Sequence, residues 1–422
     1  MKTTQYSSYL LTNVLLETGY VYEDDQVTGT KTAIFNLRID DGMISEVLSK
    51  GAVLPPELPR YDARGLLLLP SFREMHIHLD KTFYGGPWRA VRPAPNGKWD
   101  RIREEQELLP LLLPTAQERA EKLIEMILGY GSTYVRSHCN IDPVIGVNNL
   151  ESLLRALDHY KDKISHEIVA FPQHGLVRPE VASSVIASMK EAMRMGVTHV
   201  GGIDPATVDG DMEKSLQTII ELAVEYEAGI DIHLHDGGET GLNTIRRLAD
   251  LTEEAGLQGR VTVSHAFSLA SAAPGEDKEL AGRLASLGIS IASSVPAGKG
   301  MMPIPLLMAN KVEVMLGNDS IIDHWSPFGT GDILQKSNLA AQLYGWSSEY
   351  SLSRALALAT GGVIPLDEKG VQVWPAPGVE ASGVLVDASC SAEAVARLPR
   401  RVAVFHRGNL ASGSLDAAQT FA

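Results

Sequence analysis

The stretch "LLLLPSFREMHIH", Leu66–His78, ends a long apolar run with two histidines two positions apart. In a β-strand, side chains at positions i and i+2 point to the same face. If this stretch forms a strand, His76 and His78 leave it on one side, which suits two ligands of one metal ion. Two histidines on an exposed strand would have the same spacing, so the rest of the chain must decide between the two interpretations.

Seven further short apolar runs follow and alternate with segments of helical pattern, such as residues 116–131 and 213–229. The runs are "STYVRSHCN" (132–140), "HEIVAFPQH" (166–174), "VTHVGGIDP" (197–205), "GIDIHLHD" (229–236), "RVTVSHAF" (260–267), "ISIASSV" (289–295) and "VEVMLGND" (312–319). An alternation of strands and helices is typical of a parallel sheet covered by helices. Eight such units predict an α/β fold, a (β/α)8 barrel of the TIM type, with catalytic groups at the carboxyl ends of the strands.

The predicted strand ends are rich in metal-ligating and ionisable side chains. Six of the 12 histidines stand there: His76, His78, His138, His233, His235 and His265. Gln173, Asp204 and Asp319 stand at the ends of three further runs. Histidines scattered over a surface would not coincide with strand ends in this way, so the pattern favours a metal site.

The segments that flank the eight units contain short β runs instead. Residues 8–68 read as strands, with Asp41 and Gly42 marking a hairpin turn. "SGVLVDAS" (382–389) and "RVAVFHRGNL" (401–410) read the same way near the other end of the chain. We therefore expect β structure at both ends of the chain around a central α/β unit.

The composition of the 422-residue chain is that of a soluble globular protein, with 44% hydrophobic and 21% charged residues. Its net charge of −15 disfavours binding to nucleic acid or an anionic membrane. No apolar run reaches membrane-spanning length, and residues 1–19 lack the continuous apolar core of a signal peptide. The two cysteines, Cys139 and Cys390, form no disulfide framework, and we expect a cytoplasmic protein.

Three histidines and one carboxylate make a plausible ligand set for zinc or another first-row divalent ion: His76, His78, His233 and Asp319. A catalytic site keeps one coordination position for water, whose pKa the metal lowers from about 15.7 to about 7. His265 and Asp319 would hold that water by hydrogen bonds and take its proton.

Other residues near the predicted strand ends also fit structural roles. His138 fits packing at the barrel rim as well as it fits a substrate role, and His235 fits the support of a ligand as well as metal binding. Asp204, which precedes Pro205, fits the start of a turn, and Lys81 fits a solvated loop charge.

Motifs of several other enzyme classes are absent from the sequence. It contains no G-x-S-x-G elbow, no P-loop and no G-x-G-x-x-G that opens a helix after a strand. It also lacks a Cys-x-x-Cys pair, which excludes the zinc deaminases that bind their metal through cysteines.

Five segments together resemble the amidohydrolase superfamily. They are "PSFREMHIHLDKTF" (70–83), "GGIDPAT" (201–207), "DIHLHD" (231–236), "RVTVSHA" (260–266) and "GNDSIIDHWSPFGTGD" (317–332). Within the superfamily, the chain is most similar to the branch of cytosine deaminase and N-isopropylammelide isopropylaminohydrolase. The resemblance covers most of the chain, and the strand-end histidines and aspartate occur in the family's order.

The resemblance implies a distorted barrel over residues 69–365 and a small β-sandwich built from residues 1–68 and 366–422. It implies one divalent ion per chain, zinc first and iron as the alternative, held by the four ligands named above. His265 would then bond the nucleophilic water or the developing oxyanion. Binuclear relatives carry a bridging lysine or glutamate at the end of strand 3 or 4, where this chain has Gln173.

The same resemblance predicts the substrate side of the site. Cytosine deaminases use the glutamine that matches Gln173 to bind the pyrimidine ring amide, and Lys81, Ser320 and Trp325 are the other expected substrate contacts. The glutamate proton shuttle of those enzymes is Asp236 here, and their second aspartate is Ser320. Arg73 and Glu74 are also unusual for the family and have no explanation from sequence.

We therefore predict a metal-dependent hydrolase that releases ammonia or an amine from a small nitrogen heterocycle such as a pyrimidine or triazine. His265, Asp319, Asp236 and His235 are the predicted proton-transfer residues. Hydrolysis of a cyclic amide or imide, plain cytosine deamination, and a non-enzymatic barrel that stores metal or senses a ligand are the alternatives. The expected partner is the heterocyclic substrate, with homo-oligomerisation left open.

Overall fold

The computed structural model describes residues 7–296 and 300–415, which contain two eight-stranded sheets. In the first sheet, strands follow one another in sequence order and every paired neighbour is parallel. Its strands are β6 (Phe72–Ile77), β7 (Ser132–Asn140), β8 (Ser165–Phe171), β9 (His199–Ile203), β10 (Gly229–His233), β11 (Val261–Ser264), β12 (Ser290–Ser293) and β13 (Val314–Leu316).

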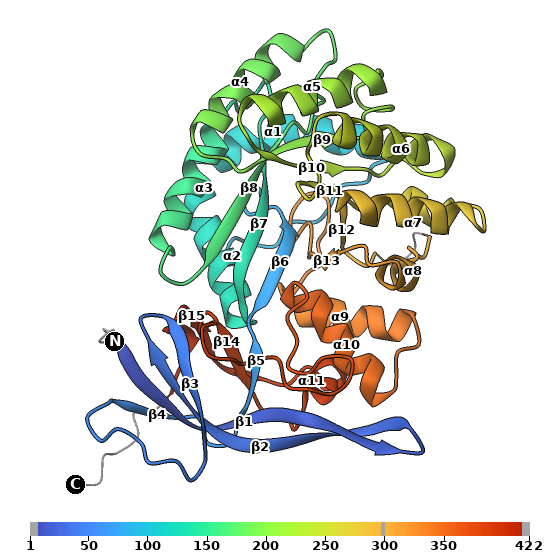
Figure 1. The fold of residues 1–422 in the computed structure, drawn as a ribbon. Coiled ribbons are helices and arrows are strands. Elements are labelled where there is room, and N and C mark those ends of the chain that lie inside the picture. The colour runs from blue at the N-terminus through green and yellow to red at the C-terminus, as the bar shows by residue number, and fades with distance from the viewer. Residues whose placement is uncertain (1–6, 297–299, 416–422) are drawn as a thin grey trace.

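A parallel bridge between Ile77 and Asp319 brings the first strand of this sheet to the last. The amide of Asp319 also donates to the carbonyl of His76 at 2.7 Å. The sheet thus forms a nearly closed barrel with helices between its strands (Figure 1). The predicted (β/α)8 barrel is confirmed.

Most of these helices cover the outside of the barrel with an apolar face, whereas α1 (Lys98–Leu112) turns Lys98 and Glu105 toward residues at the carboxyl ends of the strands. In α3, for example, Leu150, Leu153 and Leu157 recur at helical spacing and are buried. The barrel helices are α1 (Lys98–Leu112), α2 (Ala116–Gly129), α3 (Asn148–His159), α4 (Ala182–Arg194), α5 (Met212–Glu225), α6 (Gly238–Glu254), α7 (Glu276–Leu287) and α8 (Ile304–Ala309), with 3-10 turns at Leu113–Thr115 and Phe267–Ser271.

The second sheet combines strands from both ends of the chain, as expected. Its strands are β1 (Ser8–Glu23), β2 (Gln26–Asp40), β3 (Met43–Ser49), β4 (Arg60–Asp62), β5 (Leu67–Pro70), β14 (Gly383–Val386), β15 (Arg401–His406) and β16 (Asn409–Gly413). Asp41 and Gly42 form the predicted hairpin turn, with φ of 47° and 81°. The central position of β5, between β1 and β14, joins the two chain ends into one layer below the barrel (Figure 1).

The stretch expected to be one strand, Leu66–His78, is two strands in different sheets. β5 pairs with β14, and β6 pairs with β7. The backbone changes sheets at Ser71, whose amide donates to Ser382, while the next amide, of Phe72, donates to Gly131 of the barrel. The predicted domain boundary after residue 68 falls inside β5. The three predicted domain ranges remain predictions. Residues 1–6 and 416–422, at the ends of the first and last ranges, lie outside the described residues.

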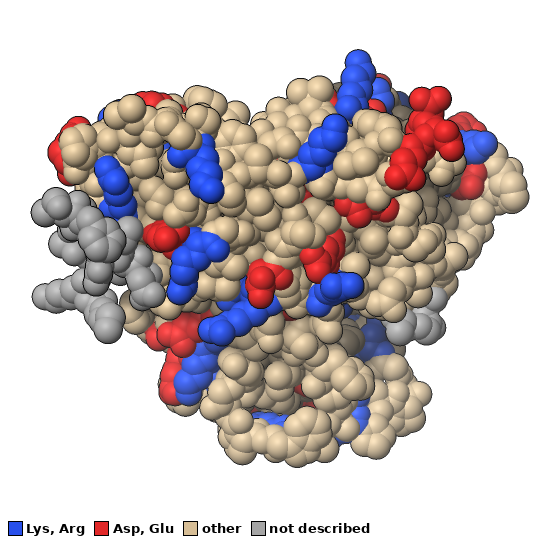
Figure 2. All heavy atoms as spheres, turned by 90° about the horizontal axis from the view of Figure 1, so that it is seen from below, with Lys and Arg blue, Asp and Glu red and all other residues tan. Residues whose placement is uncertain are grey.

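Three helices near the carboxyl end were not anticipated from the pattern: α9 (Ile333–Leu343), α10 (Glu349–Thr360) and α11 (Ser391–Arg397). They lie between the barrel and the second sheet (Figure 1). Figure 2 shows the molecule from the side of that sheet, where basic and acidic side chains are interspersed. No helix within residues 7–296 and 300–415 is long and apolar enough to cross a membrane. Cys139 and Cys390 are buried, and both are free thiols.

Candidate metal-dependent active site

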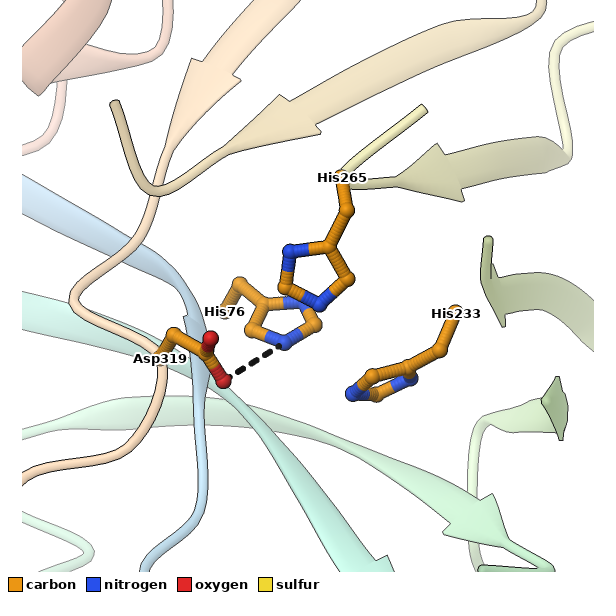
Figure 3. A group of neighbouring side chains, drawn as sticks. All are labelled: His76, His233, His265 and Asp319. Carbon is orange, nitrogen blue, oxygen red and sulfur yellow. Dashed lines mark ion pairs between the residues drawn. The ribbon is translucent and has the colours of Figure 1, made fainter. Parts of the chain in front are cut away.

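Five of the predicted site residues come together at the carboxyl end of the barrel. His76 lies in β6 and His78 directly after it, His233 ends β10, His265 follows β11, and Asp319 follows β13. The four histidines are almost fully buried, whereas the Asp319 side chain is 30% exposed. Figure 3 shows His76, His233, His265 and Asp319 pointing toward a common centre.

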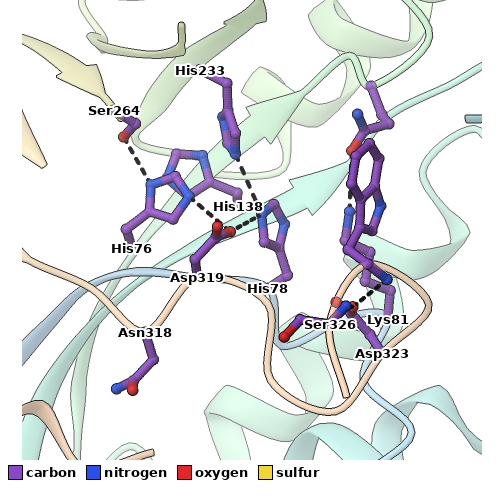
Figure 4. Close-up of polar contacts among 12 residues, drawn as sticks. His76, His78, Lys81, His138, His233, Ser264, Asn318, Asp319, Asp323 and Ser326 are labelled. Atoms are coloured by element: carbon purple, nitrogen blue, oxygen red, sulfur yellow. Dashed lines mark hydrogen bonds and ion pairs between the residues drawn. The ribbon is translucent and has the colours of Figure 1, made fainter. Parts of the chain in front are cut away.

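The distances within this cluster are short enough for shared coordination. Nε2 of His78 lies 3.3 Å from Nε2 of His233 and 3.4 Å from Oδ1 of Asp319. Nε2 of His76 lies 3.5 Å from the same oxygen (Figure 4). Ligand atoms of His76, His233, His265 and Asp319 all lie within 4.8 Å of one another. His78 lies next to this group, because its Nε2 is close to both His233 and Asp319.

The charge state of these groups also fits a bound cation. Burial lowers the pKa of His78 to about 3, and it lowers the pKa of His233 and of His265 well below the usual value, so the rings are neutral. Burial by itself raises the pKa of Asp319, but the facing imidazoles hold it well below its usual range. Nε2 of His76 and both ring nitrogens of His265 have no hydrogen-bond partner within the described part of the chain.

Such unpaired buried groups are costly, at about 1–3 kcal/mol each. Three neutral imidazoles and one carboxylate are the ligands that zinc and related divalent ions bind in proteins. A cation at the centre of the cluster would therefore satisfy groups that the protein leaves unpaired, and the residues present fit a metal ion.

Backbone conformation at the site is unusual. His265, Asp319 and Asp204 have positive φ values of 70°, 63° and 38°. The left-handed region costs a residue with a side chain roughly 1–3 kcal/mol, and such residues gather at functional sites. Here they lie where strands end.

Glu74, which the sequence left unexplained, anchors the segment that carries Asp319. Its fully buried carboxylate accepts hydrogen bonds from the amides of His76 and Asn318, at 3.2 and 2.9 Å, and from Nδ2 of Asn318 at 2.5 Å. Figure 4 shows the Asn318 side chain turned away from the histidines. Burial raises the pKa of Glu74 to about 7, although these hydrogen bonds act to lower it. Arg73 packs 3.8 Å from the centre of the Tyr134 ring.

His235 is held by a charged group beside the cluster. Its Nδ1 lies 3.2 Å from Oδ2 of the buried Asp204, and its ring stacks on that of His265 with centroids 4.5 Å apart. Lys98 of α1 donates to Asp204 at 2.8 Å and to Asp236 at 3.3 Å. Thr207 also donates to Asp236, at 2.5 Å, so the Asp236 carboxylate is bonded to Lys98 and Thr207 and not to the histidine cluster.

Lys81 is not a solvated loop charge, because it is 1% exposed and forms an ion pair with Glu105 at 3.2 Å. Lys81 also donates to Oε1 of Gln173 at 3.1 Å. Glu105, in α1, accepts further hydrogen bonds from Nδ2 of Asn140 at 2.6 Å and from Nε1 of Trp325 at 3.3 Å. Three of the predicted substrate contacts, Lys81, Gln173 and Trp325, thus belong to one buried network.

The remaining candidates are placed as follows. His138 is fully buried with the centre of its ring 4.1 Å from that of His76, and neither of its nitrogens has a hydrogen-bond partner within the described residues. Ser320 is half-buried, directly after Asp319. Sequence reasoning missed Glu105 and Lys98, because both lie in a highly charged helical stretch that resembles a solvated surface.

The sequence pattern of the amidohydrolase family matches residues 61–388. The chain belongs to this family and is a metal-dependent hydrolase of carbon–nitrogen bonds. It is 51% identical, over 96% of its length and 88% of the relative's, to the Escherichia coli K12 protein described as uncharacterized protein YahJ.

Two solved structures share the whole architecture. N-isopropylammelide isopropylaminohydrolase from Burkholderia multivorans superposes with a TM-score of 0.83 at 29% identity, covering 96% of this chain and 98% of that one. 5-Methylcytosine deaminase from Klebsiella pneumoniae, liganded with 5-fluorocytosine, superposes with a TM-score of 0.78 at 26% identity, covering 96% and 97%.

Proposed function

We propose that this enzyme releases an amine or ammonia from a ring carbon of a small nitrogen heterocycle, a pyrimidine or a triazine. The observation that carries the proposal is the convergence of buried imidazoles on the Asp319 carboxylate, with Nε2 of His78 3.4 Å and Nε2 of His76 3.5 Å from Oδ1. The substrate class is supported by the likeness to the isopropylaminohydrolase and to the 5-methylcytosine deaminase.

One divalent ion, with zinc preferred over iron, would be held by His76, His78, His233 and Asp319. When bound, such an ion acts as a Lewis acid and makes water nucleophilic near neutral pH. Gln173 at the end of β8 stands where binuclear relatives have a bridging ligand, and its amide bonds Lys81. An amide bonded to an ammonium group is a poor bridge between two cations, and this favours a single ion.

His265 and His235 are the proposed proton carriers. Asp204 bonds Nδ1 of His235, which leaves Nε2 available to protonate the leaving nitrogen. The stacked ring of His265 lies between His235 and the ligand cluster and would receive a proton from the attacking water. Because Lys98 and Thr207 bond Asp236, we assign the shuttle to His235 and His265, with Asp236 helping to position them.

Side chains beside the cluster also suggest how a ring would be oriented. Oε1 of Gln173 accepts from Lys81, so the amide nitrogen of Gln173 is free to donate to a ring nitrogen or carbonyl. The indole N–H of Trp325 bonds Glu105, so this side chain would offer the substrate its ring face. Ser320 in place of an aspartate leaves room for a substituted amine.

The test is a comparison of kcat/KM for cytosine, 5-methylcytosine and N-alkylated aminopyrimidines and aminotriazines, with released ammonia or alkylamine quantified. We expect an N-alkylated ring to exceed cytosine, because kcat/KM ratios report differential binding of transition states. Parallel assays with zinc-loaded and iron-loaded protein identify the effective metal.

A kcat/KM for cytosine above about 10⁴ M⁻¹s⁻¹ with every analogue slower would identify a plain cytosine deaminase and contradict the expected preference for an N-alkylated ring. A different result would refute the proposed reaction itself. Ring opening without release of an exocyclic amine would identify a cyclic amide or imide hydrolase.

A further inference from the structure

A chain of hydrogen bonds leads from His76 into the interior of the barrel. Nδ1 of His76 lies 2.8 Å from the hydroxyl of Ser264 in β11 (Figure 4). That hydroxyl donates in turn to Oδ1 of Asp231 in β10, at 2.6 Å. All three side chains are buried, and Asp231 and Ser264 are 0% exposed.

The direction of these bonds fixes the tautomer of His76. A serine hydroxyl has one proton, and Ser264 donates it to Oδ1 of Asp231. The Ser264 oxygen must then accept from Nδ1 of His76, which therefore carries the ring proton. In this tautomer the lone pair that can bind a metal is on Nε2, the nitrogen that lies 3.5 Å from Asp319 in the ligand cluster.

Arg136 of β7 balances the charge of Asp231. Its guanidinium donates to Oδ2 of Asp231 at 3.0 Å, to Glu167 at 2.7 Å and to the hydroxyl of Thr262 at 2.9 Å. Removing such a partner from a buried carboxylate is strongly destabilising. The pair therefore keeps a negative acceptor at a fixed position beneath the metal-binding cluster.

A second cation is the competing explanation, because ligand atoms of His76, His138 and Asp231 also lie within 4.8 Å of one another. The surroundings argue against it. The Asp231 oxygen that faces His138 at 3.8 Å is the one bonded by Arg136, whose positive charge would repel a cation. Nδ1 of His76 is also engaged by Ser264.

We propose that Asp231 is a positioning residue that acts through Ser264 to orient His76 and to strengthen Nε2 as a metal ligand. The proposal rests on the assignment of His76 as a ligand in the proposed function. Partners of this kind change metal affinity by about 10–100-fold when they are removed.

The experiment measures the zinc dissociation constant of each purified variant by competition with a chromophoric chelator, without any substrate. We expect Ser264→Ala and Asp231→Asn to weaken zinc binding by about 10–100-fold, whereas Ser264→Thr, which keeps the hydroxyl, retains most of the affinity. Ser337→Ala is the matched control, because Ser337 is equally buried but bonds the carbonyl of Ala355 away from the site. It should bind zinc as the wild type does.

Wild-type zinc affinity in a folded Ser264→Ala protein would overturn the proposal. So would a drop from two bound ions to one in Asp231→Asn, which would reveal a second cation site instead. If Asp231→Asn does not fold, the Ser264→Ala and Ser264→Thr pair decides. Failure of the proposed function has a different signature: tight zinc binding that depends on Ser264, with no amine released from any ring.

Discussion

His265 lies against the ligand cluster, yet neither of its ring nitrogens has a hydrogen-bond partner within the described residues. The proposed function assigns His265 to proton transfer, so its loss should spare the metal, whereas the loss of a ligand should not. We expect His78→Ala and His233→Ala to lose metal and turnover together. His265→Ala should keep at least about 0.8 metal per chain and lose roughly 10²–10⁴-fold in kcat, the usual contribution of general acid–base catalysis. Elemental analysis and steady-state kinetics check this, and metal-free His265→Ala protein would contradict the role.

The Lys81–Glu105 pair is a second test at the level of single residues. Lys81 and His324 hold the pKa of the Glu105 carboxyl well below its usual range although burial raises it. Lys81→Met leaves that carboxylate buried without its main cation, and we expect the free energy of unfolding to fall by about 3–5 kcal/mol. Denaturant unfolding of metal-loaded protein measures it.

The double variant Lys81→Met/Glu105→Gln is the control for this pair. It removes both charges, so it should recover part of the lost stability. A loss below about 1 kcal/mol in Lys81→Met alone would show that Asn140 and Trp325 suffice to stabilise the carboxylate.

Single residues also show where sequence reasoning stops. The histidines and Asp319 could be singled out because strand ends of a parallel barrel meet at one place. Glu105 and Lys98 could not, because a charge on a helix looks the same whether it faces water or a neighbouring carboxylate. Glu74 was visible as an anomaly, but its bonds to His76 and Asn318 depend on how β6 meets the segment after β13.

Among the secondary-structure elements, the eight barrel strands were predictable from short apolar runs ending in polar residues. The separation of Leu66–His78 into β5 and β6 was not, because both halves are buried and apolar, and only their pairing partners distinguish them. α9 and α10 were missed because no predicted site residue drew attention to that segment. α11 is a 7-residue helix between two β runs, too short for its periodicity to be recognised.

His199, the first residue of β9, allows a test of how stability depends on pH at a position away from the metal cluster. Burial, aided by Arg136, lowers the pKa of His199 from 6.5 to about 4. The unfolded chain then binds more protons than the folded one between these values. The stability contribution of neutral His199 is complete above pH 6.5 and is lost as the pH falls toward 4.

We therefore expect the wild type to lose more unfolding free energy than His199→Asn when the pH is lowered from 7 to 4.5. Urea denaturation at both pH values measures the difference. The other histidines titrate in both proteins and cancel in the comparison. Parallel pH dependence of the two proteins would contradict the pKa assignment.

For the whole molecule, the sheet from both chain ends and the barrel are joined through β5 and β6, and β6 carries two of the proposed ligands at its end. The architecture and the family were predictable from the sequence, because the motifs occur in order along most of the chain. The substrate was not, because the mutual placement of the proposed contacts Lys81, Ser320 and Trp325 is defined only in the folded chain.

We propose that one metal ion, held by three histidines and Asp319, makes this chain a hydrolase. The most direct test titrates metal-depleted protein with zinc while bound metal and amine release are followed in the same samples. We expect no amine release without metal, and a rate that rises linearly with added zinc and saturates at one zinc per chain. Saturation only at two zinc ions per chain, or full activity in the metal-depleted protein, would contradict it.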